Sequence, residues 1–188
     1  MNSVVILKHL ICISFRGLSD ISAGELIFQA KRDTASYLKE LAAAGKITYT
    51  LIATGLFFDG GLPYPPCGIN FKEGTATIPG TGDEKLSVID REDIGRFVAA
   101  ILKKPEETKN KVIRVTGETT TANELVKLYE KEHGKKIKVS YRPADEIDRV
   151  AQEGLKSGNL GAYFSNRIPL FQGTGRTQID KPTEVLLS

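Results

Sequence analysis

The stretch from Phe28 to Asp59 reads FQAKRDTASYLKELAAAGKITYTLIATGLFFD. Its first part places apolar residues at helical spacing and stops at Gly45, a residue that suits the left-handed position after a helix. The part from Ile47 to Thr54 is β-branched and aromatic, which predicts a strand that ends at Gly55. A helix followed by a buried strand is the repeating unit of an α/β protein, so this stretch decides the fold class.

The rest of the chain repeats the alternation of strand and helix. Pro105 marks the end of one helix, and the capping box from Thr121 to Glu124 marks the start of another. After Gly161 the apolar residues follow no clean period, and the tail from Gly173 is loop-like. We expect strands over 1–15, 47–54, 112–115 and 137–141, two short strands around the turn at 79–83, and helices over 25–44, 91–104, 121–133 and 144–156. The helix at 91–104 is expected to bury one face, made of Ile94, Phe97, Val98, Ile101 and Leu102.

Size and charge limit the kinds of function. The 188 residues suffice for one domain with a real core, and the 26 basic and 23 acidic residues are too balanced for a nucleic-acid binder. Cys12 and Cys67 lie in no Cys-x-x-Cys pattern, and His9 and His133 are isolated, so we expect no metal site and a reducing cytoplasm. The apolar run at 4–15 is interrupted by polar residues and is shorter than a membrane span, which favours a buried strand over a signal peptide.

Ligands of α/β sheets bind beyond the carboxyl ends of the strands. Two places qualify: residues 54–58, after the strand at 47–54, and residues 116–121, after the strand at 112–115. Gly55 would let the backbone approach a flat ligand, and Phe57 or Phe58 would wall a nicotinamide or an aromatic substrate. The plainer alternative, a strand end followed by core aromatics, is favoured by these residues alone.

Lys31 lies near the start of its helix, where a positive charge opposes the helix dipole. In a cleft at the sheet end, its ammonium could bind a nicotinamide ribose or lend a proton to a carbonyl. The plainer alternative is a surface lysine beside Arg32, which the local sequence by itself favours. No glycine-rich phosphate loop follows a strand, because Gly80-Thr-Gly82 has no helix directly behind it and reads as a turn.

Longer patterns in the chain add a family resemblance. They are F-x-x-K-x-x-x-x-x-Y-L from Phe28, ITYTLIATGLFFDGGL over 47–62, DREDIGRFVAAILKKPEETKNKVIRV over 90–115, TANEL from Thr121, and GKK from Gly134. In this order and spacing they resemble the NmrA-like and isoflavone-reductase-like branch of atypical short-chain dehydrogenases, over about residues 20–142. The pattern over 90–115 is the most specific of them.

The resemblance implies an α/β fold with a partial Rossmann-like parallel sheet, its N-terminal half missing, and a small C-terminal substrate lobe. We therefore expect a single NmrA-like domain over 1–188 that is truncated at its N-terminus. It would comprise a divergent start at 1–17, a family-like core at 18–142, and C-terminal helices and tail at 143–188. The family's glycine-rich phosphate loop, and the residue that selects NAD or NADP, have no counterpart in this sequence.

The resemblance also implies roles for single residues. Lys31 matches the family's catalytic lysine, which contacts the cofactor ribose and assists proton transfer. The residues after the strand at 47–54 match the stretch along the nicotinamide of NADP or NAD, and those that follow match substrate-side positions. The expected cofactor-binding residues are Lys31, Thr54, Gly55 and Phe57, and the expected substrate-binding residues are Phe58, Asp59 and Leu62.

Three interpretations stay open from the sequence. The first is an NAD(P)-dependent reductase-type protein for a small-molecule carbonyl or alkene, in a form that lacks the dinucleotide phosphate loop. The second is a non-catalytic NAD(P)-sensing regulator with a protein partner, and the third is an inactive fragment with an exposed sheet edge. Neither nucleic acid nor a membrane is expected as a partner, and the sequence leaves open whether this chain is itself an enzyme.

Overall fold

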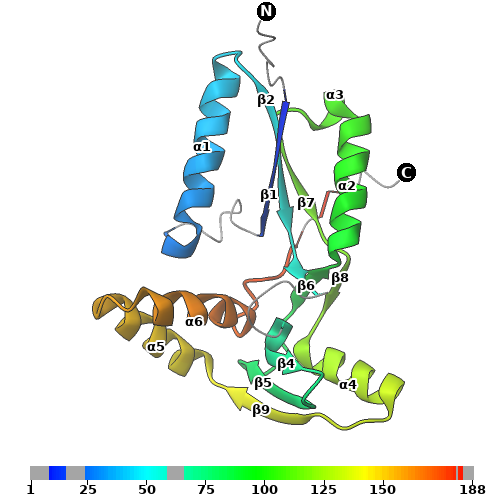
Figure 1. Ribbon diagram of the computed structural model, residues 1–188, viewed down its shortest axis with the longest axis vertical. Helices are drawn as coiled ribbons and strands as arrows, with labels where there is room; N and C mark the ends of the chain where they lie inside the picture. Colours follow the sequence, from blue (N-terminus) through cyan, green and yellow to red (C-terminus); the bar gives the residue numbers. More distant parts are fainter. Residues whose placement is uncertain (1–8, 16–23, 59–65, 181, 184–188) are drawn as a thin grey trace, which may run out of the picture. The chain divides into compact units, whose positions relative to one another are not determined.

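The computed structural model describes residues 9–15, 24–58, 66–180 and 182–183 (Figure 1). The chain divides into two compact units, each of which is described by itself. Unit 1 takes its residues from 1–54, 92–115 and 181–188, and unit 2 takes its residues from 55–91 and 116–180. The predicted helix and strand that begin at Phe28 therefore lie in unit 1, and the residues from Gly55 onward lie in unit 2.

Unit 1 is built on a three-stranded, fully parallel sheet with the strand order β1-β2-β7. The strands are β1 (His9–Phe15), β2 (Thr48–Thr54) and β7 (Lys111–Val115). A 3₁₀ turn at Leu26–Phe28 leads into helix α1 (Gln29–Ala43), which runs alongside the sheet (Figure 1). Helices α2 (Arg91–Lys103) and α3 (Pro105–Thr108) precede β7. The expected parallel sheet is confirmed here.

The core of unit 1 lies between α1 and the sheet. Ala35 and Leu38 of α1 cluster with Tyr49 and Leu51 of β2, and half-buried residues such as Leu10 pack against them. The central strand β2 is almost wholly buried because a sheet covered on its faces by helices leaves no side of that strand to water. The Thr50 hydroxyl inside this core donates a hydrogen bond to the Thr108 carbonyl oxygen at 2.9 Å, which satisfies a polar group that would otherwise be costly to bury.

In its described residues, unit 2 holds two small mixed sheets, three α-helices and a 3₁₀ turn at Pro66–Gly68. One sheet has the order β3-β6-β8, and the other has the order β4-β5-β9. The pairs β3–β6 and β5–β9 are parallel, whereas β6–β8 and β4–β5 are antiparallel. The strands are β3 (Leu56–Phe57), β4 (Ile69–Asn70), β5 (Thr75–Pro79), β6 (Leu86–Ile89), β8 (Glu118–Thr120) and β9 (Lys138–Arg142), and the helices are α4 (Ala122–His133), α5 (Ala144–Lys156) and α6 (Leu160–Gln172).

Most of the predicted elements are present at nearly the predicted bounds. The cap residues also agree: the Thr121 hydroxyl accepts a hydrogen bond from the Glu124 N–H at 3.1 Å, and Gly134 ends α4 with φ 63°. Pro105 follows the end of α2, as expected, and also begins the short helix α3, because proline at the first helical position lacks only an N–H that would be unpaired there.

One prediction about a helix was wrong, and the expected C-terminal helices at 143–188 include one that had no predicted bounds. Leu102 was placed on the buried face of α2, but it is 60% exposed, because the buried stripe consists of Ile94, Phe97 and Ile101 alone. The chain after Gly161 forms helix α6, although its apolar residues show no clean helical period. The reason is that α6 is buried on most sides, so polar residues such as Asn166 and Gln172 lie inside as well.

Among the described residues, no helix combines the length and apolar character that crossing a membrane requires.

Candidate functional site at the carboxyl end of the unit 1 sheet

The three strands of unit 1 end together. Phe15 of β1 lies opposite Thr54 of β2, and Thr54 lies opposite Val115 of β7. Because all three strands run the same way, their carboxyl ends form one edge of the sheet. Parallel α/β sheets bind their ligands outside this edge, so it is the first place to look for a site.

Thr54 occupies the last position of the central strand. Its side chain is fully buried, with 0% of its surface exposed, and its hydroxyl oxygen has no hydrogen-bond partner among the described residues. Thr50, four residues earlier in β2, is equally buried, but its hydroxyl is paired with Thr108. Buried hydroxyls are nearly always paired, so the exception at the sheet end indicates a group that could serve a bound molecule.

Lys31 is the third residue of α1 and is exposed. Helix α1 lies between β1 and β2 in the chain and runs back along the sheet, so its first turn is at the carboxyl end of those strands (Figure 1). The neighbouring Arg32 is engaged locally, because its guanidinium donates to the Glu25 carbonyl oxygen at 2.8 Å and to Gln29 Oε1 at 2.6 Å. Lys31 and Thr54 thus belong to the same end of unit 1.

Gly55, the first residue of unit 2, has a structural reason to be glycine. A Cβ atom at this position would lie 2.5 Å from the carbonyl oxygen of Ser87 in β6, far inside van der Waals contact. The sequence interpretation was that the absence of a side chain lets a flat ligand approach. In unit 2 the close approach is made by the protein's own backbone.

The two phenylalanines after Gly55 differ in their surroundings. Phe57 is half-buried and pairs with Ile89 in the β3–β6 ladder. Phe58 is 37% exposed, and its ring meets Phe71 edge-on, with 6.4 Å between the ring centroids. Phe71 in turn stacks on Tyr129 at 4.5 Å, so Phe58 stands at the end of an aromatic row. The other two expected substrate-side residues, Asp59 and Leu62, lie outside the described residues.

The second sheet end named from the sequence, residues 116–121, is used internally. The Thr116 hydroxyl lies 3.2 Å from the carbonyl oxygens of both Val88 and Glu118, and the Gly117 N–H donates to the Val88 carbonyl oxygen at 2.9 Å. Strand β8 then pairs antiparallel with β6. These contacts leave the first sheet end as the better candidate.

The Gly80-Thr-Gly82 turn is also closed to a phosphate. Both glycines have positive φ, 74° and 83°, so the turn points backbone N–H groups inward in the manner of an anion-binding loop. The Glu84 carboxylate already fills it, accepting from the Thr81 N–H at 3.0 Å and from the Gly82 N–H at 2.9 Å. The sequence interpretation of a turn is confirmed, and the physical reason is this internal carboxylate.

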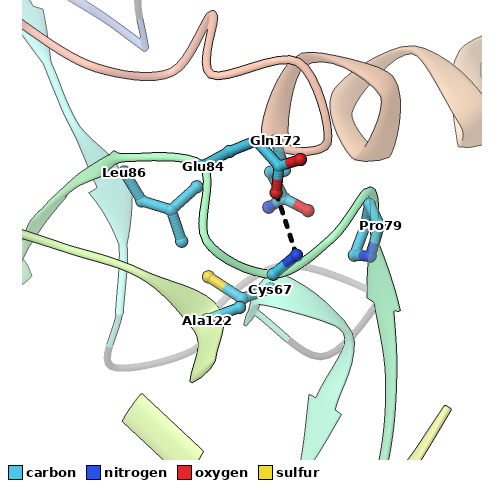
Figure 2. Close-up of a pocket in the computed structure, with 7 residues that line it drawn as sticks. Cys67, Pro79, Glu84, Leu86, Ala122 and Gln172 are labelled. Carbon is cyan, nitrogen blue, oxygen red and sulfur yellow. Dashed lines mark hydrogen bonds between the residues drawn. The ribbon is translucent and has the colours of Figure 1, made fainter. Parts of the chain in front are cut away.

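Sequence reasoning missed the small cavity that Cys67, Glu84 and Gln172 line in unit 2 (Figure 2). Gln172 is the last residue of α6, the helix that the apolar pattern did not predict. Cys67 is 1% exposed, and burial raises the pKa of its thiol from 9.0 to about 12. A signal that was available is the Gly80–Glu84 turn, because a carboxylate that follows a Gly-x-Gly turn can fold back onto its N–H groups.

The fold and the sheet end together define a class: an α/β protein whose central parallel strand ends in a buried, unpaired hydroxyl and whose first helix begins with an exposed lysine at the same end. The chain belongs to the NmrA-like family, since the sequence profile of that family matches residues 7–158. This confirms the resemblance that the sequence patterns indicated.

Individual relatives agree with this assignment. The oxidoreductase aprR of Aspergillus flavus is 30% identical over 134 residues, which are 71% of this chain and 44% of the relative. An isoflavone reductase homolog of Solanum tuberosum is 29% identical over 137 residues, again 71% of this chain and 44% of the relative. The chain therefore spans less than half the length of these relatives.

A solved structure, AtPrR2 with NADP+ and (+)-pinoresinol, superposes with a TM-score of 0.68 at 20% identity. The superposition covers 94% of this chain and 57% of that one. At this identity the likeness shows the shared Rossmann-like fold, and the expected α/β fold class is confirmed.

Proposed function

We propose that this chain carries the nicotinamide side of an NAD(P)-dependent reductase site of the isoflavone-reductase-like kind. In this proposal Lys31 contacts the cofactor ribose and supplies a proton, and Thr54 hydrogen-bonds the bound cofactor. By family resemblance Gly55 and Phe57 continue the nicotinamide side, and Phe58, Asp59 and Leu62 belong to the substrate side. The substrate is a small molecule with a carbonyl group or a conjugated alkene.

The observation that carries the proposal is the Thr54 hydroxyl. It is buried, it has no partner among the described residues, and it lies at the carboxyl end of the central parallel strand. A hydroxyl both donates and accepts hydrogen bonds, so it suits the amide and ribose hydroxyl groups of a nicotinamide nucleoside. A purely structural threonine at the end of a strand gains nothing from an unpaired hydroxyl.

Lys31 supports the proposal through its position and charge. Its ammonium group offers three donors on a flexible stem, and it is exposed at the same end of unit 1 as Thr54. Such a group can hold a ribose hydroxyl oxygen and pass a proton to a substrate oxygen as negative charge develops there. The bound cofactor itself would supply the hydride.

The residues present fit the nicotinamide side of the cofactor better than its phosphates. The sequence holds no glycine-rich loop between a strand and a helix, and the Gly80–Gly82 turn is filled by Glu84. A solved relative binds NADP+, which favours a nicotinamide cofactor here without selecting NADP over NAD. The two cysteines, Cys12 and Cys67, are free thiols, which fits a reducing cytoplasm.

The same residues also fit a second candidate function, an NAD(P)-sensing regulatory protein. Such a protein would bind the nicotinamide cofactor and respond to its redox state without turnover. This candidate shares Lys31 and Thr54 with the first and differs only in the absence of substrate reduction.

Titration of NADPH and NAD+ into the purified chain tests the proposal. We expect the reduced nicotinamide fluorescence to change and the melting temperature to rise as cofactor is added, because the ligand binds the folded state. Reduction of carbonyl or alkene substrates, followed as loss of NADPH absorbance, separates the enzyme from the regulator. If millimolar cofactor changes neither the nicotinamide fluorescence nor the melting temperature, the proposed function is contradicted both as an enzyme and as a regulator.

A pair of lysine variants tests the site itself. Lys31→Ala is expected to weaken NADPH binding by about tenfold, on the order of 1.4 kcal/mol, since it removes a charged hydrogen-bond donor to the ribose. Lys39→Ala removes another exposed lysine, from the far half of α1, and serves as the matched control. Equal affinities for the two variants would show that Lys31 does not contact the cofactor.

A further inference from the structure

A small cavity lies in unit 2 where the end of α6 meets the Gly80–Glu84 turn. Its wall consists of Cys67, Pro79, Gly82, Glu84, Leu86, Ala122 and Gln172 (Figure 2). The volume that the centre of a water molecule can occupy in this cavity is about 10 Å³, which is enough for one water molecule. Most of the wall is apolar, so the few polar groups that reach it decide what it can hold.

Gln172 brings an unpaired donor to this cavity. Its side chain is 4% exposed, and its amide nitrogen has no hydrogen-bond partner among the described residues. A buried amide donor left without an acceptor is unfavourable unless a bound atom accepts from it.

Glu84 brings an acceptor to the same cavity. Its Oε1 accepts from the N–H and the hydroxyl of Thr81, at 3.0 and 3.1 Å, whereas among the described residues Oε2 accepts from the Gly82 N–H alone, at 2.9 Å. A carboxylate oxygen has room for a second hydrogen bond. Glu84 and Gln172 both line the cavity, and Figure 2 draws their side chains as sticks in its wall.

We propose that this cavity binds one neutral hydroxyl oxygen, which accepts a hydrogen bond from Gln172 Nε2 and donates one to Glu84 Oε2. The oxygen belongs either to a water molecule or to the hydroxyl group of a small alcohol or phenol whose remaining atoms stay outside. This site shares no residue with the proposed cofactor and substrate site, so its test is separate from that of the proposed function.

The donor and the acceptor together select this chemistry. A carboxylate or phosphate would be repelled by Glu84, and a ketone or ether oxygen would accept from Gln172 but could give nothing to Glu84. A cation would find one carboxylate and an amide nitrogen that turns its donors inward, which is too few oxygen ligands. The remaining wall of Pro79, Leu86, Ala122 and Cys67 offers apolar contact and a neutral thiol.

A crystal structure of the full chain tests the site directly. We expect electron density for a single oxygen within hydrogen-bonding distance of both Gln172 Nε2 and the Glu84 carboxylate. An empty cavity, or a Gln172 amide paired with another protein atom, would overturn the proposal.

Soaks with phenol and with anisole, its methyl ether, distinguish the source of the oxygen. A phenol hydroxyl in place of the water shows that a small molecule can supply it, whereas water that persists in the presence of phenol shows that water is the ligand. Both results support a hydroxyl site. Anisole entering as readily as phenol would overturn the proposal, since an ether oxygen cannot donate to Glu84.

The stability of Gln172→Met gives an independent readout. Methionine keeps the length of glutamine and removes the amide, so loss of a real hydrogen-bonded oxygen lowers the melting temperature. Gln152→Met on α5 is the control, because that half-buried glutamine makes only one long hydrogen bond, 3.4 Å, to Asp148. If Gln172→Met melts at the same temperature as the original protein or higher, the amide had no ligand and the proposal fails.

Discussion

The two units treat their buried polar groups differently. In unit 1 the Thr50 hydroxyl inside the sheet is paired, and the Thr54 hydroxyl at the sheet edge is not. In unit 2 the polar groups of the Gly80–Glu84 turn are paired with one another, whereas Gln172 Nε2 and Thr177 Oγ1, at the end of α6 and just after it, have no partner among the described residues. Unpaired buried groups are costly, so each one marks a place where a bound group would restore a hydrogen bond.

The units also use glycine differently. Gly45 in unit 1 has positive φ, 68°, and no atom within 4 Å of the place where a Cβ would stand. Gly68 in unit 2 has a similar φ, 74°, but a Cβ there would lie 2.0 Å from the Thr77 carbonyl oxygen. At Gly68 two backbone segments of unit 2 meet closely, whereas Gly45 lies at an open helix end of unit 1.

The largest effect should come from replacing these two glycines. We expect Gly68→Ala to lower the free energy of unfolding by about 3 kcal/mol, since it adds a steric clash to the cost of a left-handed residue. Gly45→Ala carries only the conformational cost, roughly 1 kcal/mol. Denaturant unfolding of both variants measures the difference. Equal losses would show that unit 2 is not packed more closely than unit 1 at these positions.

Two threonine variants within β2 sharpen the comparison of paired and unpaired hydroxyls. Thr50→Val removes the bond to Thr108 and a 3.2 Å contact with His9, and should cost about 2 kcal/mol. Thr54→Val removes a hydroxyl without a partner among the described residues, and should change the stability by less than about 0.5 kcal/mol. A large loss for Thr54→Val in the absence of cofactor would mean that its hydroxyl is paired within the protein.

The two cysteines should contribute differently to the pH dependence of the free energy of unfolding, and this effect is smaller than the preceding ones. Burial raises the pKa of the Cys67 thiol from 9.0 to about 12, so between these values the folded state keeps a proton that the unfolded state has lost. The free energy of unfolding should therefore fall as pH rises through this window, by about 1.4 kcal/mol per pH unit from this group. Below pH 9 the contribution is constant, because both states hold the proton.

The measurement is the slope of unfolding free energy against pH for the original protein and for Cys67→Ala. The variant should lose this part of the slope, while Cys12→Ala in unit 1, where the thiol is only half-buried, should retain it. Parallel slopes for all three proteins would show that Cys67 is accessible to water.

Local sequence predicted the elements whose signals are local. The capping box at Thr121, the glycine stop at Gly134 and the β-branched run of β2 each determine structure within a few residues. Helix α6 escaped prediction because its burial on most sides removes the apolar stripe by which a helix is recognised. Leu102 was misplaced for the related reason that the width of a buried face depends on what packs against it.

In the candidate site, too, the sequence predicted some features and only the structure showed others. Lys31 and Thr54 were named from the sequence, and the structure brings both to one end of unit 1, because the parallel direction of β1 and β2 places the start of α1 there. The sequence interpretation made Gly55 a point where a ligand approaches the backbone. In the structure the Ser87 backbone approaches it, since a Cβ on Gly55 would lie 2.5 Å from the Ser87 carbonyl oxygen. A single sequence cannot tell these apart, because both demand a residue without a side chain.

By itself the sequence determined the alternation of helices and strands, the family, and the residues at the end of the central strand, because periodicity, capping and ordered motifs are properties of the chain. Only the tertiary structure decided which buried polar groups have a hydrogen-bond partner and which do not. The Thr50 and Thr54 hydroxyls are the same group in the same strand, and Thr108, a partner 58 residues away from Thr50, makes the difference. Pairing over such a separation depends on packing and cannot be read from neighbouring residues.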